Sequence, residues 1–298
     1  MSGPVLVGAQ ELRRRVPVAA AVDALEAALR DGAAPGTAPA RSSLPVAGGE
    51  LLLMPAAGAR FAGVKLATVA PGNAARGLPR IQGVYVLFDA VTLTPVALVD
   101  AVALTALRTS AVSALAVRHL APPGSAPVRL VVFGRGPQGV AHVEAVAAVR
   151  AVGTTTVLGR DATPAQVAGA VAAAHVVVCA TTARHPLFDA GSVLPGAVVV
   201  AVGSHEPDAR EVPTGLVARA HVVVETRGSA LREAGDVVLA AAELGVPAAE
   251  LVAADLAELV AGRLTLDPER PRLFKSVGEA WEDLVVASAA YEAVIRNG

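Results

Sequence analysis

The chain is short of the residues that several classes of protein require. Aromatic residues make up 3% of its 298 residues, charged residues make up 17%, and cysteine occurs once. The lone Cys179 excludes an intramolecular disulfide and fits a reducing cytoplasm. Its apolar surroundings favour a small core residue over a reactive thiol. The formal net charge of −1 gives no electrostatic basis for binding nucleic acid or a membrane surface.

The chain also lacks a long, uninterrupted apolar run. The longest segment without Asp, Glu, Lys or Arg is 162–183; it contains Pro164 and Gly169 and breaks naturally into a helix and a strand, so we expect no membrane span. No basic flank precedes an apolar run at the N-terminus, so we expect no signal peptide and a cytoplasmic location. No pair of His or Cys residues has ligand spacing within one element, so we expect no metal site.

What the chain has in abundance is aliphatic residues. Hydrophobic residues, mostly Ala and Val, make up 54% of it, which suits a parallel sheet flanked by Ala-rich helices. From Val128 onward, short apolar strands alternate with helical segments, as in right-handed βαβ units. Thr163 before Pro164 is typical of a helix N-terminus. The expected strands are 128–133, 155–158, 175–180, 197–202 and 221–225.

A glycine-rich turn follows the first of these strands. Its sequence is Gly134-Arg135-Gly136-Pro137-Gln138-Gly139, and it precedes a helix expected at 140–148. Glycines allow a sharp turn and bring backbone N–H groups at a helix N-terminus up to a pyrophosphate. We therefore predict a dinucleotide site formed by Gly134, Gly136, Pro137, Gln138 and Gly139. The alternative is an ordinary glycine-rich strand-to-helix turn.

The end of the next strand bears on the choice of cofactor. An acid at this place usually holds the ribose 2′-hydroxyl of NAD, whereas an Arg favours a 2′-phosphate. Here the sequence is Gly159-Arg160-Asp161, so Arg160 favours NADP(H), while Asp161 keeps NAD(H) possible. Thr181 lies at the carboxyl edge of a later strand, where its hydroxyl faces the cofactor or caps the following turn.

The first part of the chain has a different pattern. We expect one amphipathic helix at 11–31, strands at 64–69, 83–89 and 96–100, and a helix at 105–120. Pro122-Pro123-Gly124 then interrupts the pattern, and we place a domain boundary there. The final helix, 278–296, is expected to return to the first domain. The predicted domains are 1–121 completed by 275–298, and 122–274.

Several local motifs resemble those of one known family along nearly the whole chain. They are Gly63-Val64-Lys65, Gly77-Leu78-Pro79, Leu107-Arg108-Thr109, Gly203-Ser204, and Ser276-Val277-Gly278 followed by Glu282-Asp283. This set resembles the ornithine cyclodeaminase/mu-crystallin family. The resemblance implies an α/β protein: a Rossmann-type dinucleotide-binding domain plus an α+β substrate and dimerisation domain. It also implies a homodimer that acts on small α-amino or α-imino acids with a nicotinamide cofactor.

The resemblance further implies residue roles. Arg41, Lys65 and Arg108 would hold the substrate carboxylate, Lys65 would also act in catalysis, and Thr109 would join the cofactor site. A guanidinium pairs with a carboxylate through two hydrogen bonds, so this set is chemically sensible. Each residue also has a simpler interpretation: Arg41 as a solvated loop residue, and Arg108 as a surface residue beside an apolar stripe. Lys65 stands in an apolar strand, where a solvated lysine is harder to place.

Three departures from the cyclodeaminases guide the functional prediction. Leu52 replaces the acid that meets the ornithine side chain, and His205 replaces the catalytic Asp. Because a leucine cannot compensate for desolvating a terminal ammonium, ornithine cyclodeamination is disfavoured, while the hydride step survives. His205 is either a proton donor and acceptor or an ordinary loop histidine. Arg80 replaces the usual Thr and either binds a second acidic group of the substrate or points to solvent.

We therefore predict an NAD(P)H-dependent oxidoreductase that moves hydride at the α-carbon of an imino or amino acid. Reduction of a ketimine or cyclic imine is the preferred reaction, and amino acid dehydrogenation is the same chemistry in reverse. Two alternatives stay open. One is a cyclodeaminase-type lyase that releases ammonia and recycles NAD; the other is a crystallin-like protein that binds cofactor without turnover.

Overall fold

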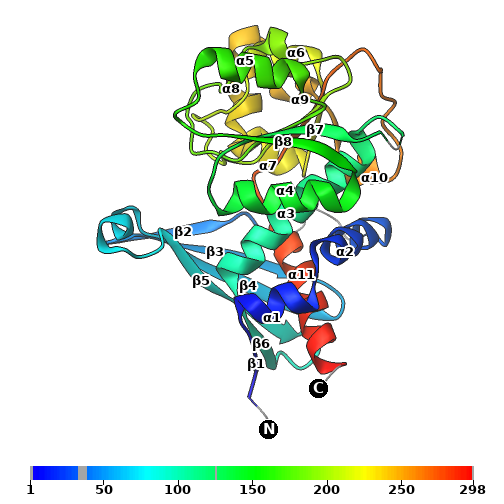
Figure 1. Cartoon of the computed structure of the whole chain (residues 1–298). Coiled ribbons are helices and arrows are strands. Elements are labelled where there is room, and N and C mark those ends of the chain that lie inside the picture. The colour runs from blue at the N-terminus through cyan, green and yellow to red at the C-terminus, as the bar shows by residue number, and fades with distance from the viewer. Residues whose placement is uncertain (1–2, 33–38, 125, 297–298) are drawn as a thin grey trace. The chain divides into compact units, whose positions relative to one another are not determined.

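The computed structural model describes residues 3–32, 39–124 and 126–296 (Figure 1). The chain divides into two compact units, the first reaching to Arg108 and resuming at Glu279, the second running from Thr109 to Gly278. The division falls inside helix α3 (Ala101–Leu120), not at the Pro122–Gly124 segment that follows it. Helix α3 is continuous across this division, so its first part belongs to the first unit and the rest to the second. The second junction comes after strand β13 (Arg272–Lys275), which belongs to the sheet of the second unit.

The first unit is built on a six-stranded sheet. Its order is β1-β6-β5-β4-β3-β2, and every neighbouring pair is antiparallel except β1 with β6. The strands are β1 (Val5–Val7), β2 (Ser42–Val46), β3 (Gly49–Ala57), β4 (Phe61–Val69), β5 (Ile81–Asp89) and β6 (Pro95–Asp100). Its helices are α1 (Ala9–Arg15), α2 (Val18–Arg30), the short 3₁₀ helix η1 (Pro71–Arg76) and α11 (Ala280–Ile295).

Alternation along these strands gives the sheet one buried face. On β4 the buried positions are Gly63, Lys65 and Ala67, and the cross-strand partner of Lys65 on β5 is the buried Tyr85. Residues two apart on a strand face the same side, so a charged residue shares this face with core residues. Helix α11 contacts β3, β4 and β5, and it also packs on α2 (Figure 1).

The helix expected at 11–31 is two helices. α1 ends at Arg15, and Pro17 is the N-cap of α2, because proline lacks the N–H that would continue α1. Likewise α3 begins at Ala101 and not at 105, since the Asp100 side chain accepts hydrogen bonds from the N–H groups of Val102 and Ala103.

The second unit is a seven-stranded parallel sheet. Its order is β12-β11-β13-β10-β9-β7-β8, so the last strand in sequence, β13, lies between β10 and β11. The strands, besides β13, are β7 (Val128–Phe133), β8 (Val152–Leu158), β9 (Val176–Cys179), β10 (Val198–Ala201), β11 (His221–Val224) and β12 (Val252–Asp255). The helices are α4 (Pro137–Val149), α5 (Pro164–Ala173), η2 (Ala190–Ser192), α6 (Thr214–Arg219), α7 (Arg227–Glu233), α8 (Gly235–Leu244), α9 (Ala248–Leu251) and α10 (Leu256–Val260).

The strand order explains where a ligand binds in such a sheet. The chain goes from β7 outward to β8 and then returns to β9 on the other side of β7, which makes the carboxyl ends of β7 and β9 a topological switch point. Strands β9, β10, β11 and β13 are buried throughout, so side chains cover both sheet faces. The predicted cap at Thr163 is present, with Gln166 completing a capping box.

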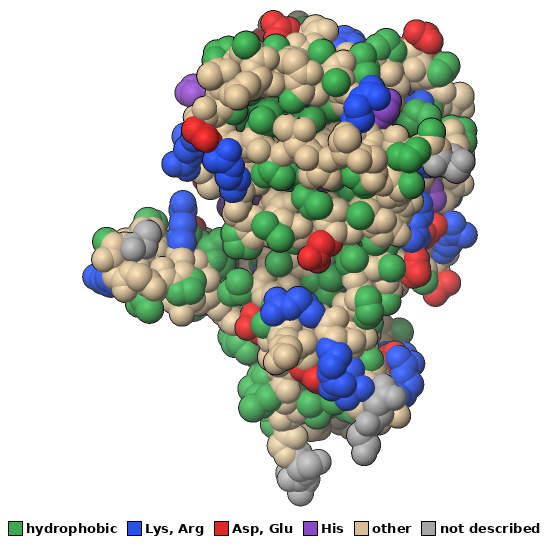
Figure 2. Space-filling model, viewed as in Figure 1, with side chains coloured by type: hydrophobic (Ala, Val, Ile, Leu, Met, Phe, Trp, Pro, Cys, Tyr) green, Lys and Arg blue, Asp and Glu red, His purple; other side chains and the backbone are tan. Residues whose placement is uncertain are grey.

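The predicted α/β architecture, a Rossmann-type unit with a second α+β unit, is confirmed. Among the described residues, one helix, α3, is long and apolar enough by composition to cross a membrane, but 72% of its most apolar segment is buried within the protein, as in a core helix. On the face shown in Figure 2, basic and acidic side chains are scattered in small mixed groups, without an extended patch of one sign.

Candidate active site

Two buried ion pairs lie under the sheet of the first unit. The Lys65 Nζ atom donates to Asp283 Oδ2 at 2.7 Å, and Arg108 Nη1 donates to Glu282 Oε2 at 2.7 Å. Arg108 Nε also lies 3.3 Å from Asp283 Oδ1. The side chains of Lys65 and Arg108 are 4% and 6% exposed, and both carboxylates are fully buried. Charges are buried together only when they are paired, so these four residues form one electrostatic unit.

Both acids come from the first turn of α11, which begins at Ala280. Negative charge in the first turn is favourable because the helix dipole is positive at that end. The cations come from β4 and α3, so the cluster joins three elements that are far apart in sequence. It can hold an anion, because Nζ of Lys65 carries three hydrogens and, among the described residues, Asp283 is its hydrogen-bond partner.

Burial lowers the pKa of Lys65 to about 8; the Asp283 carboxylate opposes this shift and the Arg108 guanidinium adds to it. At neutral pH the amine is therefore mostly an ammonium. Tyr85 completes the cluster: its pKa is raised by burial and by the charge of Asp283. Its ring lies against Gly63, where any Cβ would overlap the ring, and its hydroxyl has no hydrogen-bond partner within the described chain.

The glycine turn of the second unit is sterically tight. Gly134 has φ +113°, and a Cβ there would overlap the carbonyl oxygen of Ala180. A Cβ on Gly139 would overlap the carbonyl oxygen of Gly134. Gly136 is the N-cap of α4, its Cβ position faces open space, and Pro137 is the first residue of the helix. The turn therefore leaves room for a group to approach the helix N-terminus, as a pyrophosphate does.

A buried histidine anchors this helix. His142 Nδ1 donates to the Gln138 carbonyl at 2.7 Å, and Nε2 lies 2.9 Å from Ser113 Oγ on α3. Burial lowers the pKa of His142 to about 4, so the ring is neutral at pH 7. The residue therefore joins α4 to α3. Nearby on α3, the Thr109 hydroxyl is buried and has no hydrogen-bond partner among the described residues.

Two arginines lie at the end of β8. Arg135 Nη1, from the glycine turn, contacts Asp161 Oδ1 at 2.7 Å, and Arg160 Nη2 donates to Thr182 Oγ1 at 3.2 Å. Arg135 lies over Gly159, where a Cβ would come within 2.6 Å of Nη1. Asp161 is thus paired with a cation, and the Arg135 hydrogen bond lowers its pKa.

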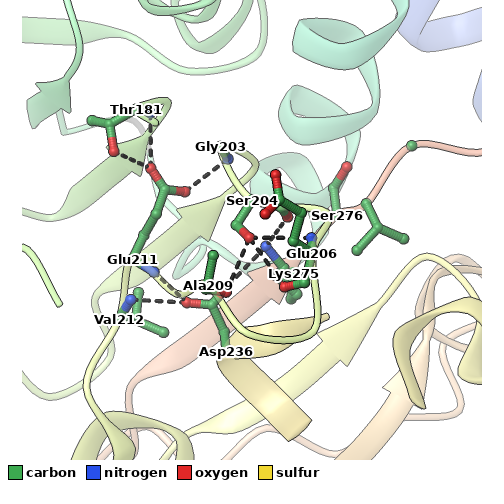
Figure 3. Close-up of polar contacts among 12 residues, drawn as sticks. Thr181, Gly203, Ser204, Glu206, Ala209, Glu211, Val212, Asp236, Lys275 and Ser276 are labelled. Carbon is green, nitrogen blue, oxygen red and sulfur yellow. Dashed lines mark hydrogen bonds and ion pairs between the residues drawn. The ribbon is translucent and has the colours of Figure 1, made fainter. Parts of the chain in front are cut away.

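A network of buried charges joins the carboxyl ends of β9 and β10 (Figure 3). Glu211 accepts hydrogen bonds from Thr181 N at 2.8 Å, Thr181 Oγ1 at 2.7 Å and Gly203 N at 2.7 Å. The Thr181 hydroxyl also accepts from Ala183 N, so it holds its turn. Of the two predicted roles for Thr181, the contacts are those of the turn-capping one.

A second tier of the network fixes the loop that carries His205. Asp236 accepts from Glu211 N at 2.7 Å, and its other oxygen lies 2.8 Å from Lys275 Nζ. Lys275 donates to the Ser204 carbonyl at 2.6 Å, and Ser204 Oγ donates to Ala209 O at 2.9 Å. His205 itself is exposed on this anchored loop.

A further carboxylate holds the segment between β13 and α11. Glu225, at the end of β11, accepts from Ser276 Oγ at 2.6 Å, Val277 N at 2.9 Å and Gly278 N at 2.8 Å. Each residue of the Ser276-Val277-Gly278 motif thus donates one hydrogen bond to the same buried acid.

Comparison with known proteins identifies the chain. Its sequence matches the profile of the ornithine cyclodeaminase/mu-crystallin family over residues 4–166 and 162–298. The chain belongs to the ornithine cyclodeaminase/mu-crystallin family. Ketimine reductase mu-crystallin of Mus musculus is 35% identical over 274 residues, covering 86% of this chain and 84% of the relative. The Δ1-pyrroline-2-carboxylate/Δ1-piperideine-2-carboxylate reductase of Azospirillum brasilense is 35% identical over 277 residues, covering 86% and 85%.

Among solved structures, Δ1-pyrroline-2-carboxylate reductase of Thermococcus litoralis, in complex with NADH and L-proline, superposes with a TM-score of 0.87. The two chains are 27% identical, and the match covers 99% of this chain and 98% of that one. The family assignment is thus confirmed, as is the prediction of an NAD(P)-dependent oxidoreductase that acts on C=N bonds.

The structure of this family member brings together some of the predicted site residues. Lys65 and Arg108 share one cluster. Arg41 is half-buried just before β2, two strands from β4 in the sheet. Arg80 is exposed in the turn before β5, and no ion pair involves it in the described part of the chain.

Each unit also has buried polar residues to which the sequence assigned no role. They are Tyr85, Glu211, Glu225, Asp236, Lys275, Glu282 and Asp283. The signal that could have found some of them is a charged residue inside an apolar run, as with Lys275 after Leu273 and Phe274. Among the described residues, no group of three or more His, Cys, Asp or Glu side chains is placed to hold a metal ion.

Proposed function

We propose that the protein reduces the C=N bond of a cyclic ketimine carboxylate, a five- or six-membered ring with its carboxylate on the imine carbon, to the corresponding cyclic amino acid. The observation that carries this proposal is the buried pair of cations, Lys65 and Arg108, in the first unit. Such a pair suits a compact carboxylate. Of two relatives above 30% identity, one is a ketimine reductase and the other is a Δ1-pyrroline-2-carboxylate/Δ1-piperideine-2-carboxylate reductase.

Lys65 and Arg108 bind the substrate carboxylate, and Arg41 adds a third cation. Lys65 has a second role, because reduction of an imine requires a proton on nitrogen. An ammonium with a pKa of about 8 is well matched to donate a proton near neutral pH. His205 is a second proton-handling group, and its exposed place on the anchored loop gives it access to solvent.

The chain's residues suit a nicotinamide dinucleotide. The tight turn at Gly134 and Gly139, with open space at Gly136, fits a pyrophosphate at the N-terminus of α4. Pro137 and Gln138 begin that helix, and the buried Thr109 hydroxyl offers an uncommitted donor. When bound, NAD(P)H supplies the hydride.

NADP(H) is the preferred cofactor. Arg160 and Arg135 place two cations at the end of β8. Asp161, the acid that would hold a ribose hydroxyl, is paired with Arg135. A 2′-phosphate gains from both cations, whereas a hydroxyl gains little from either.

The protein acts as a homodimer in the cytoplasm. Strand β2 at the sheet edge is exposed along its whole length, and its Leu44 and Val46 are each about half exposed. An apolar sheet edge of this kind favours association with a second copy.

The test is the oxidation of NADPH and of NADH by the purified protein with a panel of cyclic imine carboxylates, and with α-keto acids plus amines. Turnover of a cyclic imine with NADPH is the expected result. Ammonia released from a diamino acid, without net change in NAD(P)H, would show a cyclodeaminase and overturn the inference from Leu52 and His205. Cofactor binding without turnover of any substrate would show a protein that has lost the reaction.

A further inference from the structure

The chain uses lysine in two places only. Its 25 basic residues are arginines except for Lys65 and Lys275. Each of these lysines is almost fully buried, and each is paired with one aspartate: Lys65 with Asp283 at 2.7 Å, and Lys275 with Asp236 at 2.8 Å. Lysine differs from arginine in that it can lose its proton when buried. Both lysines thus form a buried ion pair with an aspartate. Lys275 also donates to the Ser204 carbonyl and so supports a loop.

At Lys65 the surroundings act against each other. The charged or titratable groups that face its amine are Asp283 and Glu282 from α11, Arg108 from α3 and Tyr85 from β5; the partner on β3, Met54, carries no charge. Burial and Arg108 favour the neutral amine, whereas the two carboxylates favour the ammonium. Asp283 is the nearest of these groups and makes the hydrogen bond to Nζ.

We propose that Asp283 is a positioning residue for the reduction: its carboxylate keeps Lys65 as an ammonium inside the closed cluster and directs the two remaining Nζ hydrogens to the substrate. Glu282 orients Arg108 in the same way, because its carboxylate accepts a hydrogen bond from the Arg108 guanidinium. The proposal rests on the proposed function only in the identity of the ligand. The dependence of Lys65 on Asp283 is a property of the protein alone.

This role has an acid–base consequence. A neutral Lys65 attracts a carboxylate weakly and has no acidic proton to give to an imine nitrogen. The pH at which Lys65 deprotonates should therefore appear as the alkaline limb of kcat/KM. Replacing Asp283 by an uncharged residue removes the main opposition to burial, so the limb should move to lower pH.

The first experiment observes Lys65 directly. With ¹³C- and ¹⁵N-labelled lysine, the protein gives two side-chain signals, and Lys275→Arg identifies which belongs to Lys65. In Asp283→Asn we expect the Lys65 pKa to fall by about one unit or more. Asp236→Asn is the matched control: it removes the partner of the other lysine and should leave the Lys65 pKa unchanged. An unchanged Lys65 pKa in Asp283→Asn overturns the proposal.

A second variant guards against a folding failure. Glu282→Gln removes a carboxylate that faces Lys65 without touching its hydrogen bond, so it should lower the Lys65 pKa by less than Asp283→Asn does. No fall in the Lys65 pKa of this variant would contradict the electrostatic account, even if Asp283→Asn does not fold.

The second experiment measures kcat/KM against pH with one cyclic imine and NADPH. Comparing variants on the same substrate cancels the titration of the imine itself. A positioning role for Asp283 moves the alkaline limb to lower pH, in step with the pKa measured by NMR. A merely structural role lowers kcat/KM at every pH and leaves the limb in place. If the unaltered protein reduces no imine, the proposed function fails, while the NMR titration still decides the role of Asp283.

Discussion

The buried carboxylate of Glu211 accepts the backbone N–H of Gly203 at 2.7 Å. The same side chain accepts two hydrogen bonds from Thr181, so one acid joins the turns after β9 and β10, the edge where the parallel sheet binds ligands. A glutamine at this position presents one oxygen, and its amide hydrogens then face an N–H group.

Glu211→Gln should therefore destabilise the protein by about 1–3 kcal/mol, the range for leaving buried polar groups without partners. Urea denaturation measures this loss. The matched control is Glu206→Gln, because Glu206 is exposed and pairs with Arg184 at the surface, a contact that is worth little. Equal stability of the two variants would show that the Glu211 hydrogen bonds do not hold these turns together.

His142 predicts a specific pH dependence of stability. Its pKa in the folded protein is about 4, below the ordinary value of 6.5. Above pH 6.5 the ring is neutral in both states; below it, the unfolded chain binds a proton that the folded protein refuses. Stability should fall by up to ~3 kcal/mol as pH drops from 6.5 to about 4, and then level off. Denaturation of His142→Gln at several pH values should show this component removed; an identical pH dependence in both proteins would contradict it.

Gly136→Ala separates folding from cofactor binding. A Cβ at this position meets no atom of the protein within 4 Å. The free energy of unfolding of the variant should therefore lie within about 1 kcal/mol of that of the unaltered protein. The methyl group nevertheless occupies the space at the start of α4, and NADPH affinity should fall at least tenfold, or about 1.4 kcal/mol. Fluorescence titration with NADPH measures the affinity. The control is Gly169→Ala on α5, also in open space, where binding should not change.

Arg160→Gln should lower the preference for NADPH over NADH by about tenfold or more, through loss of a charge-assisted contact to the 2′-phosphate. The affinity for NADH should stay nearly constant, since the ribose hydroxyl carries no charge. Parallel steady-state kinetics with both cofactors give the ratio. Arg184→Gln, which removes a surface guanidinium paired with Glu206 and Asp208, is the control. A fall in affinity for both cofactors alike would point to a structural role for Arg160.

Tyr85→Phe should leave stability unchanged or raise it by up to about 1 kcal/mol, because the buried hydroxyl has no hydrogen-bond partner among the described residues. Gly63→Ala should lower the stability, since its methyl group would overlap the Tyr85 ring. Thermal unfolding of both variants tests the pair. A destabilised Tyr85→Phe would mean that the hydroxyl is satisfied in solution.

Much of the second unit is readable from the sequence. Strands β9 and β10 are Val-rich throughout and β7 is apolar except at Arg129, as expected where a parallel sheet buries both faces. The glycine turn follows β7 directly. Lys65 also stands out in the sequence, because a lysine between Val64 and Leu66 in an apolar strand needs a buried partner for its charge. The partner itself, Asp283, is more than two hundred residues away, and no local pattern names it.

Other features could not be read because they depend on long-range pairing. Strand β13 looks like part of an irregular stretch after Pro268 and Pro271, and it becomes a strand only through its pairing with β10 and β11. The break at Pro17 was visible in the sequence, but the apolar period continues through it, and periodicity alone favours one helix. Glu211 and Asp236 are bound by backbone N–H groups of other segments, and every non-proline residue has such a group, so the amino-acid sequence does not reveal these hydrogen bonds.

The position of β13 in the middle of the sheet, and of α11 on the first sheet, bears on how the protein is made. In sequence, β13 follows every other strand of its sheet and α11 follows all the elements that it covers, so neither unit is complete until residues 272–295 have been made. Until then, β10 and β11 lack the strand that separates them, and the buried face of the first sheet lacks its helix. Open strand edges and uncovered apolar faces are what chaperones bind and what aggregates. A ribosome that stalls shortly before Arg272 therefore leaves both cores unfinished. The two units can complete their folding only after the same short segment, residues 272–295, has been made.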